Sequence, residues 1–163
     1  MDTNIIWAAG FMDGEGTITI KRVLRKDMKN RYYQLYISCA QVDKDPNTSV
    51  IESFKEWFGG NVSKWTQRPQ DGNRINTVCW SVVSNDALKF LEIIHPYLKV
   101  KKQQALLGIQ FQRGIVPRGR AGLSLDDMKI KEDCFYQMRR FNVKGKLQLQ
   151  RLSEETPQGD AIV

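Results

Sequence analysis

The sequence predicts an α+β protein with one four-stranded antiparallel sheet whose helices cover a single face. Two blocks of the 163-residue chain each show the patterns of strand, strand and helix, and another helix precedes the first block. Hydrophobic and polar residues alternate along the strands of the first block, as in a sheet with one buried and one exposed face. The polar positions are mostly Thr, Lys, Arg, Gln, Ser and Tyr, so we expect a polar, basic exposed face.

The first half of the chain contains a helix followed by a strand pair. Asn4 can cap the helix, and Gly14 and Gly16 are expected to end it. Apolar positions such as Ile18 and Leu35 then recur at every second residue, which is the period of a strand. The expected elements are a helix at residues 4–12, strands at 17–25 and 32–41, and a charged hairpin loop at 27–31.

The second half repeats the strand pair between helices. Pro46 opens a helix with an apolar stripe, which Gly59 and Gly60 should stop, and Ser124 should cap the last helix. The expected elements are a helix from residue 47 to 58, strands at 61–68 and 74–83, helices at 85–95, 100–113 and 125–141, and loops at 69–73 and 117–122. We expect one domain over residues 1–155 and a flexible tail at 156–163.

Positive charge is segregated along the chain. The net charge is +7, and six basic residues face a single acid between residues 17 and 41. Six more basic residues lie between residues 96 and 125, where no acid occurs. Such segregation is typical of a protein that binds a polyanion, and on an exposed sheet face it indicates nucleic acid.

The cysteine and histidine content excludes several classes of enzyme. The three cysteines lie far apart, without the spacing of a zinc site, and His95 is the only histidine. Zinc fingers, histidine-based nucleases and Ser-His triads are therefore excluded, and the cysteines are interpreted as reduced thiols.

No apolar run approaches the roughly 18 residues of a membrane span. The N-terminus also lacks the pattern of a signal or transit peptide. We therefore expect an intracellular protein that does not enter a membrane, made inside an organelle or in prokaryotic or phage cytoplasm.

Residues 8–16, A-A-G-F-M-D-G-E-G, place two carboxylates among glycines at a junction of helix and strand. A Ca²⁺ loop of the EF-hand type fails, because Ile18 and Leu24 stand where Gly and Glu are required. A dinucleotide-binding glycine loop fails as well, because the glycines follow a helix rather than a strand. Carboxylates beside a basic sheet would repel nucleic acid unless a cation lay between them, which favours a metal-dependent nuclease.

This stretch resembles the LAGLIDADG motif of the homing endonucleases, with Glu15 as the second acid. The resemblance extends over residues 4–142 through the element order, the A-Q-V-D step at residues 40–43 and the P-Y-L-K-V-K-K-Q-Q-A stretch at residues 96–105. It implies the α-β-β-α-β-β-α fold and a site-specific DNA endonuclease that makes a double-strand break in a long, roughly palindromic site. An RNA maturase that assists intron splicing and a DNA-binding regulator without cleavage are the alternatives.

The resemblance also implies roles for single residues. Glu15 would hold a divalent cation, most simply Mg²⁺, together with the Gly14 carbonyl. Lys101 would organise water around the scissile phosphate. Gln41 would enter the active site from the second strand, because its parity continues that of the inward residues, although Asp43 and Lys44 stay open as alternatives.

A single motif in one chain implies a homodimer in which two motif helices pack at a two-fold axis. The expected interface residues are Ala8, Ala9, Gly10 and Asp13. The partners would be double-stranded DNA, a second copy of the chain and, for a maturase, its own intron RNA. The residues expected to contact DNA are Thr19, Lys21, Arg25, Gln34, Tyr36, Ser38, Lys64, Thr66, Arg68 and Arg74.

Overall fold

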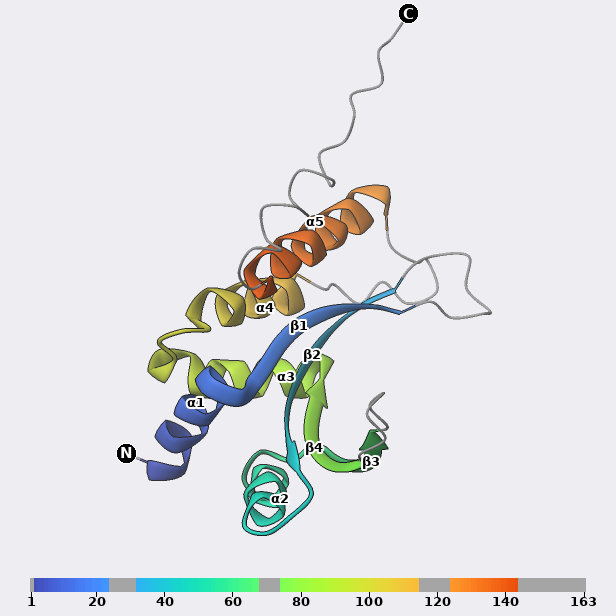
Figure 1. The fold of residues 1–163 in the computed structure, drawn as a ribbon. Helices are drawn as coiled ribbons and strands as arrows, with labels where there is room; N and C mark the ends of the chain where they lie inside the picture. Colours follow the sequence, from blue (N-terminus) through green and yellow to red (C-terminus); the bar gives the residue numbers. More distant parts are fainter. Residues whose placement is uncertain (1, 24–31, 68–73, 115–123, 144–163) are drawn as a thin grey trace, which may run out of the picture.

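The computed structural model describes residues 2–23, 32–67, 74–114 and 124–143 (Figure 1). Four strands form one antiparallel sheet in the order β1-β2-β4-β3. In Figure 1, α1 lies at the left end of the curved sheet, α5 lies above it and α2 lies below it. The predicted α+β architecture is therefore confirmed. The elements are α1 (Thr3–Glu15), β1 (Gly16–Val23), β2 (Tyr32–Val42), α2 (Asn47–Phe58), β3 (Asn61–Gln67), β4 (Ile75–Val83), α3 (Ser84–Ile94), η1 (His95–Tyr97), α4 (Lys102–Arg113) and α5 (Leu125–Asn142).

The buried face of the sheet follows the alternation seen in the sequence. Ile18, Leu35 and Ile37 are fully buried, and the register pairs Cys39 with Trp80 of β4. Trp80 packs against Phe54 of α2 and Phe90 of α3, at ring-centroid distances of 5.0 and 4.9 Å. Burial of such aromatic side chains supplies much of the stability of a core of this size.

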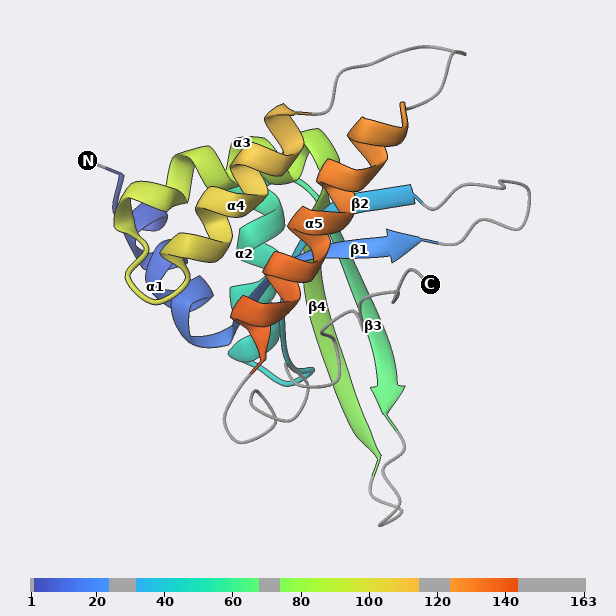
Figure 2. The ribbon, with the colours of Figure 1, turned by 90° about the horizontal axis from the view of Figure 1, so that it is seen from above.

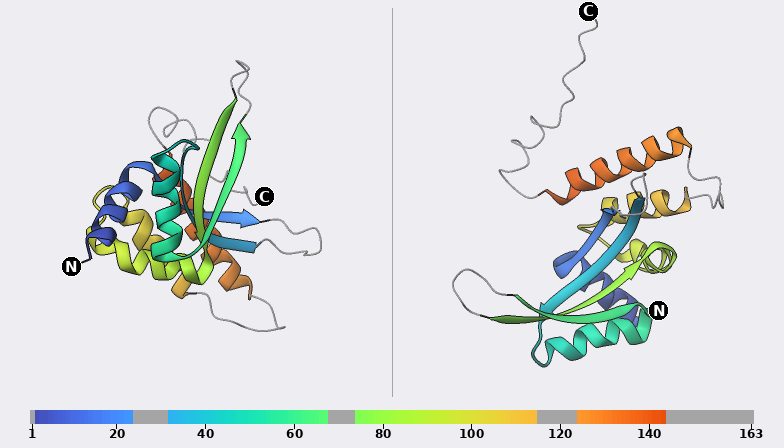
Figure 3. Two further views of the ribbon diagram at one scale, coloured as in Figure 1. Left: turned by 90° about the horizontal axis from the view of Figure 1, so that it is seen from below. Right: turned by 90° about the vertical axis from the view of Figure 1, so that its right-hand side faces the viewer.

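The helices cover the sheet in two groups. Figure 3 shows α2 running along the β3–β4 pair, whereas α4 and α5 lie at the β1 end. Figure 2 shows α5 beside β1 and β2. There the Asn142 side-chain amide donates to the Ile18 carbonyl at 2.9 Å, and the Tyr33 hydroxyl donates to Glu132 at 3.2 Å.

Two predicted helix boundaries are confirmed in detail. Ser124 caps α5 in a capping box with Asp127, whose backbone N–H donates to the Ser124 hydroxyl at 3.1 Å. Gly59 and Gly60 end α2 with φ angles of 71° and 85°, which side chains other than glycine rarely adopt. The turn also lets the Gly59 carbonyl accept a 2.7 Å hydrogen bond from the Trp80 indole.

The prediction for the first helix was wrong about its N-cap and about Gly14, whereas Gly16 ends the helix as predicted. Asp2, not Asn4, caps α1, because the Asp2 carboxylate accepts the Asn4 backbone N–H at 3.0 Å. The helix also continues past Met12 to Glu15, so Gly14 lies inside it. A single glycine lowers helix stability by only about 1 kcal/mol, and tertiary packing of α1 outweighs that amount.

Several predicted features lie outside the described residues: the loops at 27–31, 69–73 and 117–122 and the tail at 156–163. Within the described ranges, no helix is long and apolar enough to cross a lipid bilayer.

Candidate active site and nucleic-acid interface

Glu15 is the last residue of α1 and Gly16 is the first residue of β1, so no linker separates the helix from the strand. The junction requires glycine, because a Cβ at Gly16 would lie 2.3 Å from Met12 Cε and 2.8 Å from the Met12 carbonyl oxygen. The Gly16 backbone N–H donates to that carbonyl and closes the helix. Glu15 is therefore held at a tight, tertiary-packed corner.

The electrostatics at this corner favour a cation. The C-terminal end of a helix carries partial negative charge, and the last turn of α1 contains no basic residue. Glu15 is exposed, and its carboxylate forms no hydrogen bond or ion pair with the described residues. A negative charge at a helix C-terminus is unfavourable by itself, so a positive charge bound there would be stabilising.

Asp13, two residues before Glu15 in α1, is fully engaged. Its carboxylate accepts the backbone N–H groups of Lys99, Val100 and Lys101 at 2.6, 3.1 and 2.9 Å. Partial burial alone would raise the pKa of this carboxyl, but the hydrogen bonds from Lys99, Lys101 and Val100 outweigh it and lower the pKa. Asp13 therefore stays ionised and ties α1 to the segment before α4.

Lys101 lies at the same corner, as its predicted role requires. Its ammonium group donates to the backbone carbonyl of Asp13, two residues before Glu15. That carbonyl belongs to the last turn of α1, where backbone acceptors lack partners within the helix. The structure thus brings Lys101 and Glu15, which are 86 residues apart in the sequence, to one end of α1.

The register places Gln41 near the start of β1. Cys39 pairs with Gly16, and Gln41 follows two residues later with the parity of the buried positions. Because β1 and β2 are antiparallel, Gln41 extends past Gly16 toward the end of α1. This position is compatible with its predicted role.

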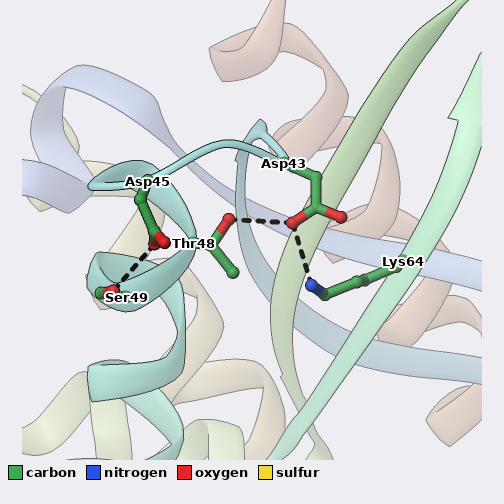
Figure 4. Close-up of polar contacts among 5 residues, drawn as sticks. All are labelled: Asp43, Asp45, Thr48, Ser49 and Lys64. Carbon is green, nitrogen blue, oxygen red and sulfur yellow. Dashed lines mark hydrogen bonds and ion pairs between the residues drawn. The ribbon is translucent and has the colours of Figure 1, made fainter.

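Asp43, one of the alternatives to Gln41, already has partners (Figure 4). Its carboxylate accepts from the Thr48 hydroxyl at 2.8 Å and from Lys64 Nζ at 2.9 Å. The hydrogen bond from Lys64 is the main cause that lowers the pKa of Asp43, and Thr48 adds to it. Asp43 therefore joins the start of α2 to β3, which favours Gln41 over Asp43 at the active site. The side chain of Lys44, the other alternative to Gln41, is exposed.

The candidate metal ligands are oxygen atoms. No three His, Cys, Asp or Glu side chains form a metal-binding group within residues 2–23, 32–67, 74–114 and 124–143. The corner offers instead the unpartnered Glu15 carboxylate and the exposed Gly14 backbone. Oxygen donors suit a hard cation such as Mg²⁺ or Ca²⁺, so the residues present fit such an ion as part of its shell.

The face of β1 and β2 away from the core has the predicted polar character. Thr19, Gln34 and Ser38 are partly exposed there, as is Tyr36. Lys21 is exposed, and its ammonium nitrogen lies 3.0 Å from the centroid of the Tyr36 ring. This cation–π contact holds a positive charge against the centre of the face.

The register places Lys64 and Thr66 on the opposite face from the one predicted. Val62 pairs with the buried Trp80, and Lys64 and Thr66 share the parity of Val62. Both side chains are also engaged: Lys64 with Asp43, and Thr66 through a 2.9 Å hydrogen bond to Asn76. Arg25 and Arg68 lie outside the described residues, and Arg74 is exposed just before β4.

The outward positions of β3 are Asn61, Ser63 and Trp65, which the sequence prediction missed. They pair with Ser81, Cys79 and Thr77 of β4, all opposite in parity to the core. The Trp65 side chain is 41% exposed. Val62 and Trp65, the apolar residues of β3, point to opposite faces of the sheet. Alternation alone therefore could not show which face of β3 is buried, whereas the pairing with β4 does.

The expected interface residues on α1 divide into two groups. Ala8 and Ala9 are fully buried against the core of their own chain, so their side chains cannot form a contact between chains. Gly10 is exposed, and a Cβ built there meets no atom within 4 Å. Ile6 and Trp7 are each 43% exposed and lie on the same helix face as Gly10.

A sequence model of the LAGLIDADG endonuclease family matches residues 8–110, which is more than half of the chain. No curated protein sequence matches significantly. The fold is similar to that of the homing endonuclease I-CvuI, with a TM-score of 0.67 at 18% identity over 93% of this chain and 92% of that chain.

Two longer endonucleases match over about half of their length. I-SmaMI gives a TM-score of 0.61 at 15% identity over 83% of this chain and 45% of that chain. I-GzeII gives 0.56 at 19% identity over 96% of this chain and 50% of that chain. At such identities these likenesses establish the fold, and the sequence model establishes the family: the chain is a member of the LAGLIDADG endonuclease family.

Proposed function

We propose that this protein is a site-specific DNA endonuclease that makes a metal-dependent double-strand break in a long, roughly palindromic site. The observation that carries the proposal is the corner between α1 and β1. There the Glu15 carboxylate, which has no hydrogen-bond or ion-pair partner among the described residues, and the Lys101 amine lie at one end of α1. This end leads directly into β1, whose polar outward face carries Lys21. The family membership and the I-CvuI structures, which hold a DNA target in the presence of Mg or Ca, support it.

In this proposal each residue at the junction of α1 and β1 has a separate role in phosphodiester hydrolysis. Glu15 and the Gly14 carbonyl hold a divalent cation, most simply Mg²⁺. When bound, the cation neutralises phosphate charge and lowers the pKa of a water molecule. Lys101, anchored to the Asp13 carbonyl, presents positive charge toward the phosphate and the water. Gln41 orients the phosphate from the end of β2.

We also propose that two copies of the chain act together. Each chain carries one motif, and it spans about half of I-SmaMI and I-GzeII. The exposed face of α1, with Ile6, Trp7 and Gly10, is the surface we assign to the contact between copies. A second copy would place a second Glu15 near the first, and each site would then act on one DNA strand.

The length of the target follows from strand geometry. The 8 residues of β1 span roughly 26 Å at ~3.3 Å per residue, or about 8 base pairs of duplex. Two sheets side by side therefore address on the order of 16–22 base pairs with two-fold symmetry.

The decisive test is cleavage of the DNA that spans the uninterrupted insertion point of the host gene. We expect the protein and Mg²⁺ to cut both strands at one position, and EDTA to stop the reaction. Tight binding without cleavage would instead identify a DNA-binding regulator. Stimulated splicing of the host intron without cleavage would identify a maturase.

Binding should weaken steeply with salt. A protein that neutralises 6–10 phosphates loses about 10³-fold or more in affinity between ~50 and ~200 mM salt. We expect a loss of this size in fluorescence anisotropy measured with Ca²⁺. A flat salt dependence would contradict a binding surface built from the basic sheet face.

The reassignment of β3 predicts unequal effects of two neighbouring substitutions. Trp65→Ala should weaken binding by about tenfold, because an exposed indole on the outer face can contact bases or thymine methyl groups. Lys64→Met should change affinity less, by about threefold at most, because Lys64 is paired with Asp43 on the other face. Gel-shift titrations of the two variants test this order, and a larger effect of Lys64→Met would refute the assignment of faces.

A further inference from the structure

We infer that Asp13 is a positioning residue, which acts through Lys101 and fixes the lysine amine at the active-site corner. The inference rests on the proposed function, because it assigns the position of Lys101 a role in cleavage. Neither the motif itself nor the expected interface of α1 explains what the acid at position 13 does. The contacts of its side chain and backbone do.

The contacts between Asp13 and residues 99–101 are reciprocal. The Asp13 carboxylate accepts three consecutive backbone N–H groups, and the Lys101 side chain returns to the Asp13 carbonyl. Backbone and side chain of Lys101 are thus both bound to one residue of α1. A lysine side chain has four rotatable bonds, and such an arrangement removes most of its conformational freedom.

Asp13 also lies beside the N-terminal end of α4. This helix begins at Lys102 with no cap from its own side chains and no acid in its first turn. The N-terminal end of a helix carries partial positive charge and unpaired N–H groups, which a carboxylate stabilises. Asp13 supplies a carboxylate beside that end by binding the backbone N–H groups of residues 99–101, up to the N-cap residue Lys101. The C-terminal end of α1 and the N-terminal end of α4 are therefore fixed at the same point.

These contacts fix the position of the Lys101 amine relative to the Glu15 carboxylate, the two groups that act in the proposed reaction. Glu15 follows Asp13 by two residues in the same helix, and the Lys101 amine is hydrogen-bonded to the Asp13 carbonyl. A displacement of about 1 Å in an active site can cost about 10²-fold in rate. Releasing residues 99–101 should therefore slow cleavage even though the DNA-binding face is unchanged.

The test compares the wild type with Asp13→Asn, Lys101→Met and the double variant. The DNA is a duplex selected by the wild-type protein in Ca²⁺ from a library of about 22 randomised base pairs. Asp13→Asn keeps the volume but loses the charge and one acceptor oxygen. We expect a single-turnover rate about 10²-fold lower, with affinity in Ca²⁺ unchanged. The double variant should be no slower than Lys101→Met alone, because once the amine is gone there is nothing left for Asp13 to position.

A second measurement does not depend on cleavage. Amide exchange followed by NMR should accelerate at least tenfold at residues 99–101 in Asp13→Asn. In the matched control Asp86→Asn, which alters an exposed acid of α3 paired with Lys89, exchange at these amides and cleavage should stay as in the wild type. Asp13→Glu, which keeps the charge, should restore part of the rate, and thermal unfolding shows that each variant is folded at the assay temperature.

Two results would overturn the positioning role while leaving the nuclease assignment intact. One is wild-type cleavage by Asp13→Asn. The other is a double variant slower than Lys101→Met by the full factor of Asp13→Asn, which would mean that Asp13 acts independently of Lys101. Unchanged exchange at residues 99–101 would refute the contact itself. If the wild type cuts none of the selected DNA, the proposed nuclease and the positioning role fall together, and the exchange result still reports on the contact.

Discussion

Glu15→Gln should abolish DNA cleavage and leave DNA binding nearly intact. The substitution keeps the volume of the side chain and removes the Glu15 carboxylate at the end of α1, which has no hydrogen-bond or ion-pair partner in the part of the chain that the structure describes. Glu15 forms no hydrogen bond or ion pair with the described residues, so the substitution should leave the fold intact, whereas a bound cation would lose its charged ligand. We expect the cleavage rate to fall at least about 10³-fold, or ~4 kcal/mol in transition-state stabilisation, with Mg²⁺ at saturation.

The control for this variant is Glu56→Gln, which changes an exposed acid of α2 away from the corner. It should bind and cut DNA as the wild type does. Calorimetric titration with Ca²⁺ gives a second readout, because Glu15→Gln should lose the heat of metal binding in the presence of DNA. Cleavage by Glu15→Gln at the wild-type rate would show that another residue holds the cation.

Gly10→Leu should separate the two chains without harming either one. A side chain at Gly10 meets no atom of its own chain, and replacing glycine within a helix stabilises it by about 0.5–1 kcal/mol. Between two closely packed helices, however, the added volume costs roughly 1–3 kcal/mol or more, and it enters from both sides. Sedimentation should therefore show a shift toward monomer, and double-strand cleavage should be lost while weak half-site binding persists.

Gly108→Leu is the matched control, because it puts the same side chain at a glycine inside the chain. A Cβ there would lie 2.9 Å from Leu91 Cδ1 and 3.0 Å from Leu35 Cδ1. This variant should lower the melting temperature of the protein itself, which Gly10→Leu should not. A dimeric Gly10→Leu protein that cuts both strands normally would place the interface elsewhere.

The order of elements could be predicted because it depends on local patterns. The alternation around Ile18 and Leu35 assigned both faces of β1 and β2 correctly, since each strand repeats apolar residues at one parity. In β3 the apolar residues Val62 and Trp65 differ in parity, so alternation gave no valid face for Lys64 and Thr66. Only pairing with a neighbouring strand, a tertiary property, settles such a case.

The sequence indicated which residues belong to the candidate site, but it did not indicate the contacts between them. The motif and the basic stretch indicated Glu15 and Lys101, but the hydrogen bonds between Asp13 and Lys101 join residues 88 positions apart. Ala8 and Ala9 were assigned to a contact between chains because small residues permit close approach. Close approach to the protein's own core satisfies the same requirement, and nothing in the local sequence distinguishes the two.

The direct passage from α1 into β1 has a consequence for the accuracy of cutting. In a DNA-cutting protein, β1 follows the shape of the groove, and Glu15 precedes its first residue with no intervening loop to absorb a shift. A poorly matched sequence that tilts the strand would therefore tilt the carboxylate by a similar amount. Mismatched sites could still be occupied, but they would be cut more slowly than their occupancy suggests. Cleavage would thus discriminate between sequences more sharply than affinity does.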